Sequence, residues 1–337
     1  MDPLPQFEVL RPENLREAIE ARAAHPGSHL LGGGTDLIVN IRRGIVAPPV
    51  LVDMTAVTEL ATIRADADAI EVGASVTLAA LAEHPDVARH YPVVAQAAHS
   101  IAGPTHREMG TVGGNLCLDT RCIYYNQSAW WRSANNHCLK TTGTICHVAP
   151  KSHGVCFATF SGDLAPAFLT LGAEVDLAGP QGRRTLPLAD LYIGHARHDG
   201  SLGDGKTYLA LRPGELVTAV RARNTPGLRS AYDKIRIRRS IEYPVAGVAV
   251  AVRRDGDLLA DLRVAFTGTN PRPVLLAGTQ TLCGTGIDDR FFQALDDLVR
   301  DQVMAMKTTF TPGHYRRRVA GVLARRLVTR LFAEAPA

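Results

Sequence analysis

The chain has 337 residues, 46% of them hydrophobic, and can therefore bury one large core or two to three smaller ones. Its 37 basic and 33 acidic side chains leave a formal net charge of +4, too small to indicate a nucleic-acid binder or a polybasic membrane anchor. The first residues lack the basic and apolar regions of a secretion signal, and the longest apolar run, Val245 to Val252, is far shorter than the roughly 20 residues that span a bilayer. We therefore expect a globular, cytoplasmic protein with no nucleic-acid or membrane partner.

The first 56 residues predict a small α/β unit. After a strand pattern at 7–12, Leu15, Ala18 and Ile19 recur at helical spacing. A short strand, a glycine-rich turn, a second helix and a buried strand then follow at 29–31, 32–36, 37–44 and 48–54.

A second, α+β unit is predicted from 57 to 220. Two strands around an acidic turn precede helices at 77–88 and 91–102. From 117 to about 153 the chain shows neither a strand period nor a helix period, and an ordered loop of that length needs more than a hydrophobic core to hold it. A helix, a hairpin and another strand follow between 162 and 222.

Residues 221–337 predict a separate C-terminal α+β domain. A hairpin at 246–268 precedes two amphipathic helices, 288–303 and 314–332. In the last helix we expect Val319, Val322, Leu323 and Leu327 to form the apolar stripe and the arginines to form a solvated or subunit-facing side.

Two glycine clusters occur on the two α/β units, Gly32-Gly33-Gly34-Thr35-Asp36 and Thr111-Val112-Gly113-Gly114-Asn115. Glycines allow backbone N–H groups to approach a phosphate closely, and a helix start adds the positive end of its dipole. Each cluster alone is more typical of a simple tight turn. Together they predict two subdomains that hold one dinucleotide from both sides.

Four of the six cysteines, Cys122, Cys138, Cys146 and Cys156, fall within one short span that also holds both tryptophans. A cytoplasmic chain keeps its thiols reduced, so metal ligands, catalytic groups or inert thiols are expected rather than disulfides. The spacing C-x15-C-x7-C-x9-C lacks the C-x2-C pairs of ferredoxins and zinc ribbons. The spacing therefore leaves zinc, an iron–sulfur cluster and buried free thiols open.

Six motifs together resemble the FAD-binding subunits and domains of the molybdenum hydroxylases, the xanthine dehydrogenase and carbon monoxide dehydrogenase group. They are LLGGGTDL at 30–37, SIAG at 100–103, TVGGNL at 111–116, SGDLAP at 161–166, ELV at 215–217 and KIRIRR at 234–239. The resemblance covers nearly the whole chain. It implies an α+β protein with a two-subdomain FAD-binding fold of the PCMH/VAO type (1–56 and 57–220), followed by a C-terminal α+β domain of the CO dehydrogenase flavoprotein type (221–337).

The resemblance also implies the residues that contact FAD. Ile101 and Ala102 would flank the cofactor, Asp163 would bind a polar portion of it, and Leu216 and Lys234 would make further contacts. The residues expected around the diphosphate are Gly32, Gly33, Gly34, Thr35, Asp36, Leu37, Thr111, Gly113, Gly114 and Asn115. Without the family, Asp163 is equally well explained as a helix N-cap and Lys234 as a solvated charge.

An insert of residues 117–158 separates two parts of this expected site, because Asn115 and Asp163 stand closer together in the family's common pattern. It is similar to the insert of 4-hydroxybenzoyl-CoA reductase β subunits, a branch of the family with a [4Fe–4S] cluster. That similarity implies Cys122, Cys138, Cys146 and Cys156 as ligands, with Cys117 a doubtful fifth and Cys283 structural.

Aromatic and histidine side chains of the insert have alternative roles. Tyr124, Tyr125, Trp130 and Trp131 either shield a cluster from water or form the insert's own small core. His137, His147 and His153 are more typical of hydrogen-bonding surface residues than of ligands.

The resemblance implies an electron-transfer subunit without a catalytic residue of its own. Electrons would pass from reduced ferredoxin through the cluster and FAD to a [2Fe–2S] small subunit and a large molybdenum-cofactor subunit, which reduces 4-hydroxybenzoyl-CoA to benzoyl-CoA, in a dimer of heterotrimers. Two alternatives remain: a flavin subunit whose insert binds structural zinc, and a scaffold that has lost FAD.

Overall fold

The first sheet is parallel and contains β1 (Glu8–Leu10), β2 (His29–Leu31) and β3 (Val50–Asp53) in the order β1-β3-β2. The computed structural model describes residues 4–193 and 204–334. Helices α1 (Leu15–Ala24) and α2 (Leu37–Arg42) connect the three strands. Asn14 caps α1 by accepting a hydrogen bond from Glu17 N, and Leu15 and Ala18 pack into the core beneath β3. The predicted alternation of strands and helices is confirmed.

The second sheet is antiparallel, with the order β4-β5-β8-β6-β7. Its strands are β4 (Ile63–Ala65), β5 (Ala69–Gly73), β6 (Glu174–Gly179), β7 (Gly182–Pro187) and β8 (Leu216–Arg223). Its helices are α3 (Leu78–Glu83), α4 (Pro85–His90), α5 (Pro92–Ser100), α6 (Pro104–Arg107), α7 (Val112–Leu116) and α9 (Leu164–Thr170), with 3-10 turns at Met54–Ala56, Thr58–Leu60 and Leu188–Leu191. The single helix expected at 77–88 is wrong: Pro85 begins a new helix, and His84 before it is extended.

The third sheet is antiparallel, with the order β12-β11-β10-β9. It contains β9 (Arg229–Ile235), β10 (Ala246–Asp255), β11 (Leu258–Thr267) and β12 (Val274–Leu275), and α10 (Asp289–Gln302), α11 (Gly313–Ala333) and a 3-10 turn at Thr279–Leu282 follow. The predicted hairpin and both helices are confirmed. Strand β9 was not predicted, because the charges of Asp233 and Lys234 interrupt its apolar pattern.

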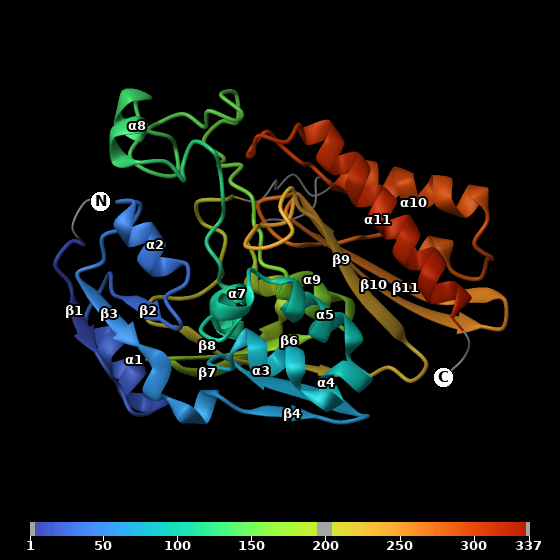
Figure 1. The fold of residues 1–337 in the computed structure, drawn as a ribbon, viewed down its shortest axis with the longest axis horizontal. Helices are drawn as coiled ribbons and strands as arrows, with labels where there is room; N and C mark the ends of the chain where they lie inside the picture. Colours follow the sequence, from blue (N-terminus) through green and yellow to red (C-terminus); the bar gives the residue numbers. More distant parts are fainter. Residues whose placement is uncertain (1–3, 194–203, 335–337) are drawn as a thin grey trace.

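Helices α5 and α9 lie between the second and third sheets (Figure 1). Ala249 of β10 packs into the core that holds these helices, whereas Val248 and Val250 pack into the core beneath α10 and α11. Strand β10 is therefore covered on both faces. This burial explains why the longest apolar run of the chain falls there.

The insert, residues 117–158, contains one short helix, α8 (Ala129–Ala134), between loops (Figure 1). Arg121 and Thr159 exchange two backbone hydrogen bonds of 2.7 Å at its base. Ile123 N donates to Thr308 O at 2.9 Å, so the insert is also attached to the segment that leads into α11. The expected lack of regular periodicity is confirmed.

Helix α11 differs from the expected stripe. Leu323 and Leu327 are buried and Val319 packs against the same core, as expected, but Val322 is 38% exposed and Arg316 is fully buried. The Arg316 guanidinium donates to Met306 O at 2.8 Å, Thr308 Oγ1 at 2.9 Å, Val245 O at 3.1 Å and also to Gly268 O. These acceptors replace the water that the charge loses on burial. In the described part of the chain, no helix is long and apolar enough to cross a membrane.

Replacing Arg316 by Ala should lower the free energy of unfolding by about 3 kcal/mol or more, because four buried acceptors lose a charged donor. Urea unfolding followed by circular dichroism measures this change. Arg326→Ala on the exposed side of the same helix is the control, with an expected change below about 0.5 kcal/mol. Equal effects of the two substitutions would contradict the assigned role of Arg316.

Candidate cofactor site

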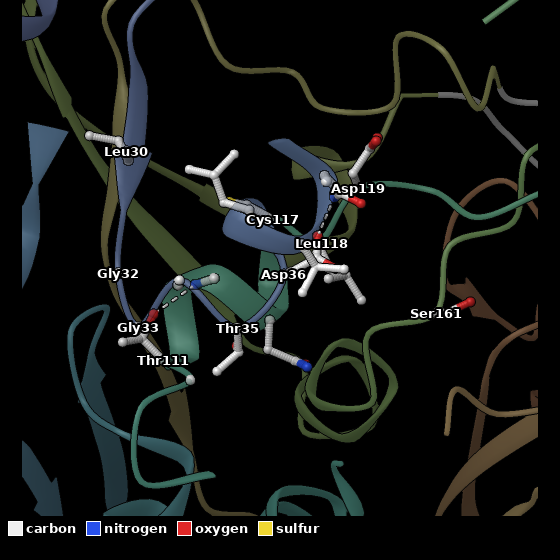
Figure 2. A pocket seen from close by; sticks show the side chains of 18 of the residues that line it. Leu30, Gly32, Gly33, Thr35, Asp36, Thr111, Cys117, Leu118, Asp119 and Ser161 are labelled. Atoms are coloured by element: carbon white, nitrogen blue, oxygen red, sulfur yellow. Dashed lines mark hydrogen bonds between the residues drawn. The ribbon is translucent and has the colours of Figure 1, made fainter. Parts of the chain in front are cut away.

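A cavity of about 860 Å³, here called the large cavity, lies between the first two sheets and is lined also by residues 241–243 (Figure 2). Both glycine clusters contribute to its wall. Its volume lies in the range of small-molecule and cofactor sites.

The two glycine loops that line the large cavity are in direct contact. A Cβ on Gly32 would lie 2.8 Å from Thr111 Oγ1, and a Cβ on Gly33 would lie 1.7 Å from Met109 O. Gly34 has a φ of +69°, which L side chains rarely adopt. Thr111 Oγ1 also accepts from Gly114 N at 3.2 Å and caps α7. Only glycine at position 33 allows the two backbones to approach this closely.

Fourteen of the fifteen predicted cofactor-contacting residues line the large cavity. These are Gly32, Gly33, Gly34, Thr35, Asp36, Leu37, Ile101, Ala102, Thr111, Gly113, Gly114, Asn115, Asp163 and Leu216. Lys234 does not line the cavity and lies behind Asp163.

Asp163 forms a buried polar cluster with Lys234 and Tyr232. Lys234 Nζ lies 3.1 and 3.0 Å from the two carboxylate oxygens, and Tyr232 Oη donates to one of them. Burial raises the pKa of Tyr232 well above its usual value, and the negative charge of Asp163 adds to this shift. Asp163 makes no side-chain capping bond to α9, and Lys234 is 8% exposed. Asp163 therefore occupies the N-cap position of α9 but its side chain binds Lys234 and Tyr232 instead of capping the helix, and the solvated-charge interpretation of Lys234 is wrong.

Asn115 joins the second glycine cluster to the start of α9. Its side-chain Oδ1 accepts from Leu164 N at 3.0 Å. Although the insert separates these motifs in sequence, the bond places Asn115 next to Asp163 on the same cavity wall.

Two non-glycine residues with positive φ meet at another edge of the cavity. Ala102 has φ 46° and Ile241 has φ 52°, and Ile241 N donates to Ala102 O at 3.2 Å. This conformation is a genuine outlier for a β-branched residue such as Ile241. Strained backbone of this kind persists where surrounding contacts enforce it, commonly at ligand sites.

A second, smaller cavity, here called the cysteine cavity, is lined by Cys122, Cys138, Cys146 and Cys156. All four side chains are buried. Burial raises the pKa of Cys122 to about 12 and that of Cys156 to about 11, although a hydrogen bond from Ala158 N and the nearby charge of Lys140 oppose the latter shift. Among the described residues, no group of three or more His, Cys, Asp or Glu side chains is arranged to hold a single metal ion.

The other two cysteines lie elsewhere. Cys117 lines the large cavity and packs against the core of the second sheet, and burial raises its pKa to about 12. Cys283 packs against the core beneath α10 and α11. Neither lines the cysteine cavity.

The aromatic side chains of the insert divide into two groups. Tyr124 and Tyr125 line the cysteine cavity, and the Trp131 ring is tilted by 44° to that of Tyr124, with ring centroids 6.1 Å apart. Trp130 is 78% exposed, so its expected shielding or core role is wrong. His147 also lines the cysteine cavity, where its Nε2 lies 2.5 Å from His137 O.

Many residues that line the large cavity were not among the predicted cofactor contacts, and they include the charged or aromatic side chains of Arg121, Tyr125, Lys140 and Tyr243. Arg121 forms an ion pair with Asp36 and lies 4.8 Å from the centroid of the Tyr243 ring. Tyr243 Oη donates to Asp36 at 3.0 Å. Arg121, Tyr125 and Lys140 belong to the insert region, where no periodic pattern indicates which side chains face inward.

Comparison with protein families gives two matches that together span most of the chain. Residues 5–222 match the FAD binding domain in molybdopterin dehydrogenase. Residues 230–331 match the CO dehydrogenase flavoprotein C-terminal domain.

Individual relatives and structures agree with these matches. The aldehyde oxidoreductase FAD-binding subunit PaoB of Escherichia coli K12 is 31% identical over 79% of this chain and 82% of its own. The carbon monoxide dehydrogenase medium chain of Afipia carboxidovorans is 28% identical over 98% of both chains. In the structure of reconstituted CO dehydrogenase from Oligotropha carboxidovorans, a chain superposes with a TM-score of 0.79 at 25% identity, covering 99% of this chain and 100% of that one.

Replacing Lys234 by Met should lower the free energy of unfolding by about 3 kcal/mol, because Asp163 loses the cation that compensates its buried charge. The matched variant Asp163→Asn/Lys234→Met removes both charges and should recover part of this loss. Urea unfolding of the two variants and the wild type measures the difference. A double variant no more stable than Lys234→Met alone would contradict a compensating ion pair.

Proposed function

The chain belongs to the family of FAD-binding subunits of the molybdenum hydroxylases, and on this basis we propose that it is an electron-transfer subunit that carries both FAD and a [4Fe–4S] cluster. The proposal assigns 1–56 and 57–220 to two FAD-binding subdomains and 221–337 to the C-terminal domain. The observation that carries it is the convergence of Cys122, Cys138, Cys146 and Cys156 on one cavity that shares a wall with the large cavity.

The large cavity has the chemistry that FAD requires. Residues 32–37 and 111–115 present glycine backbone to an anionic diphosphate, since close approach needs the absence of a Cβ. Asp163 offers a carboxylate to the hydroxyl groups of the cofactor, while Ile101, Ala102 and Leu216 offer apolar surface to its rings. Lys234 acts through Asp163, which it holds in place.

The cysteine cavity has a donor set suited to a [4Fe–4S] cluster, which takes four cysteine thiolates. Two buried cations, Lys140 and Arg316, lie nearby and favour the negative charge of such a group. Lys140 lowers the pKa of Cys156. Burial lowers the pKa of Arg316 to about 10, and the nearby Cys122 acts in the opposite direction. The insert has little apolar core of its own, so bonds to a metal centre would supply much of its order.

A structural zinc site is the competing proposal for the same cysteines. One zinc ion draws its sulfur ligands to about 2.3 Å from a single point. A [4Fe–4S] cluster would instead be held by one thiolate from each of the four cysteines that line the cysteine cavity. Iron and acid-labile sulfide in the purified protein support the cluster, whereas zinc without sulfide would overturn it.

The proposed assembly extends the role of the family. When bound, FAD and the cluster supply one- and two-electron redox chemistry. This chain's residues bind and orient the two groups and exclude water between them.

We propose reduced ferredoxin as donor, a [2Fe–2S] small subunit and a molybdenum-cofactor large subunit as partners, and a cytoplasmic dimer of heterotrimers. The proposed reaction is the reduction of 4-hydroxybenzoyl-CoA to benzoyl-CoA in anaerobic aromatic degradation. Absence of benzoyl-CoA with reduced ferredoxin and the reconstituted complex would overturn that assignment.

Gly33→Ala should abolish most FAD binding, because its Cβ would overlap Met109 O and force the two glycine loops apart. The ratio of flavin to protein after purification and titration with FAD measures this loss. Gly286→Ala is the control, because its Cβ would meet nothing nearer than 3.9 Å and its φ is not positive. Normal FAD affinity in Gly33→Ala would remove this loop contact from the site.

Cys138→Ser should remove most of the iron and sulfide while FAD remains bound, because Cys138 lines the cysteine cavity and not the large cavity. Cys117→Ser is the matched control, since Cys117 lines only the large cavity and should leave the iron content unchanged. Metal analysis, sulfide analysis and flavin absorbance measure both variants. Iron loss in Cys117→Ser but not in Cys138→Ser would overturn the ligand assignment.

A further inference from the structure

Tyr125 and Lys140 form the wall between the two cavities. They are the two residues that line both the large cavity and the cysteine cavity. The tyrosine ring and the ammonium group therefore lie at the border of both cavities.

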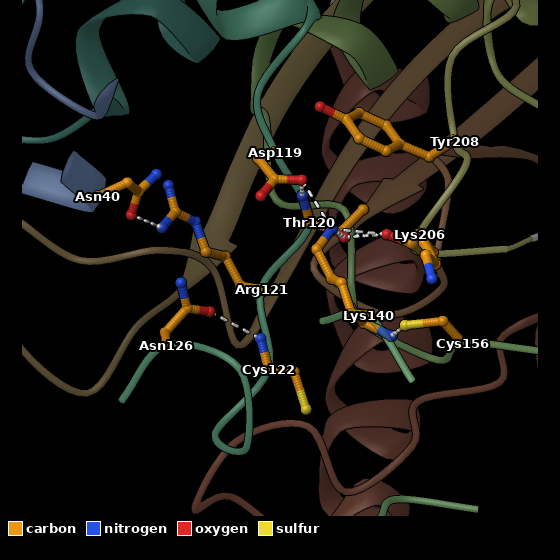
Figure 3. Close-up of polar contacts among 12 residues, drawn as sticks. Asn40, Asp119, Thr120, Arg121, Cys122, Asn126, Lys140, Cys156, Lys206 and Tyr208 are labelled. Carbon is orange, nitrogen blue, oxygen red and sulfur yellow. Dashed lines mark hydrogen bonds and ion pairs between the residues drawn. The ribbon is translucent and has the colours of Figure 1, made fainter. Parts of the chain in front are cut away.

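The ammonium of Lys140 is held rigidly in this wall (Figure 3). Its side chain is 5% exposed, and Nζ donates to Asp119 Oδ1 at 2.7 Å, to Gly205 O at 2.7 Å and also to Thr120 Oγ1. The same atom lies 4.8 Å from the centroid of the Tyr125 ring and 5.4 Å from that of Tyr208. Three acceptors and two aromatic faces therefore hold the charge in a single place.

The counter-charge lies on one side of this wall. Asp119 lines the large cavity but not the cysteine cavity, and its side chain is 27% exposed. Water screens Asp119 in part, whereas Lys140 is screened far less. The charge of Lys140 therefore acts on both cavities, while Asp119 opposes it at the large cavity and Asp204, whose Oδ1 accepts from Cys156 N at 3.1 Å, opposes it at the cysteine cavity.

A fixed positive charge favours whichever redox state of a neighbouring group is more negative. Each reduction step of a flavin or an iron–sulfur cluster adds one electron, and charge near a cluster is an established determinant of its reduction potential. In the partly buried interior the effective dielectric constant is lower than in water, so a nearby unit charge acts on such an equilibrium more strongly than it would in solution.

We propose that Lys140 is a positioning residue whose buried charge raises the reduction potentials of both redox groups at once, and that Asp119 sets the size of this effect. The inference rests on the proposed function, because it requires FAD in the large cavity and a cluster in the cysteine cavity. A single residue in the shared wall would then raise the two potentials together and leave the difference between them nearly unchanged.

The test compares charge changes of opposite sign. Lys140→Met removes the cation, and we expect both one-electron reduction equilibria to shift about tenfold toward the oxidised form, equivalent to 59 mV. Asp119→Asn removes the anion and should shift the flavin equilibrium in the opposite direction. Lys140→Arg keeps the charge and should leave both potentials near those of the wild type. Redox titration of the purified holoprotein, with flavin absorbance and electron paramagnetic resonance of the cluster, measures all four proteins.

The outcomes separate the two levels of the proposal. Wild-type protein that lacks iron overturns the proposed function and the inference with it. Full iron, sulfide and FAD in Lys140→Met with unchanged potentials overturns the inference alone. If Lys140→Met loses a cofactor, Asp119→Asn decides: an upward shift of the flavin potential supports the inference, and an unchanged or lower potential overturns it. A shift in Lys140→Arg as large as that in Lys140→Met would assign Lys140 a packing role instead.

Discussion

The contact between Gly33 and Met109 is the constraint on which the rest of the site depends. A Cβ on Gly33 would lie 1.7 Å from the Met109 carbonyl oxygen, so the two loops can close the cavity wall only as bare backbone. The loops belong to different sheets, and their contact fixes how those sheets approach each other. Asn115 connects this cavity wall to α9, because its Oδ1 accepts a hydrogen bond from Leu164 N. Asp163, held by Lys234 and Tyr232, completes it with a buried carboxylate.

The insert is attached to this frame at both ends. Arg121 pairs with Asp36 of the first glycine loop, and the backbone bonds between Arg121 and Thr159 close the base of the insert. Thr308, which Arg316 holds in place, bonds the insert from the third sheet's side. The four cysteines are thereby brought to the far side of a wall that the large cavity also uses. Two buried cations, Lys140 and Arg316, stand near them, an arrangement that suits a negatively charged group.

Much of the fold followed from local pattern, and the departures have physical causes. The helix expected at 77–88 breaks because Pro85 forces His84 into an extended conformation. In α11 only Val322 departs from the expected stripe, and Arg316 is buried because four oxygens accept hydrogen bonds from its guanidinium. Strand β9 was not predicted because the charge of Lys234 interrupts its apolar pattern. The partner that compensates this charge, Asp163, lies 71 positions away in the sequence.

The amino-acid sequence by itself determined the alternation of strands and helices, the two glycine loops and the cysteine set, because each is written in local spacing and composition. Only the tertiary structure decided that Cys117 lines the large cavity and not the cysteine cavity, and that Tyr125 and Lys140 line both. These are relations among side chains brought together by non-periodic loops. The path of such loops is set by hydrogen bonds to backbone groups that are distant in the sequence, such as the bond from Ile123 N to Thr308 O. The local sequence pattern does not indicate which distant groups these are.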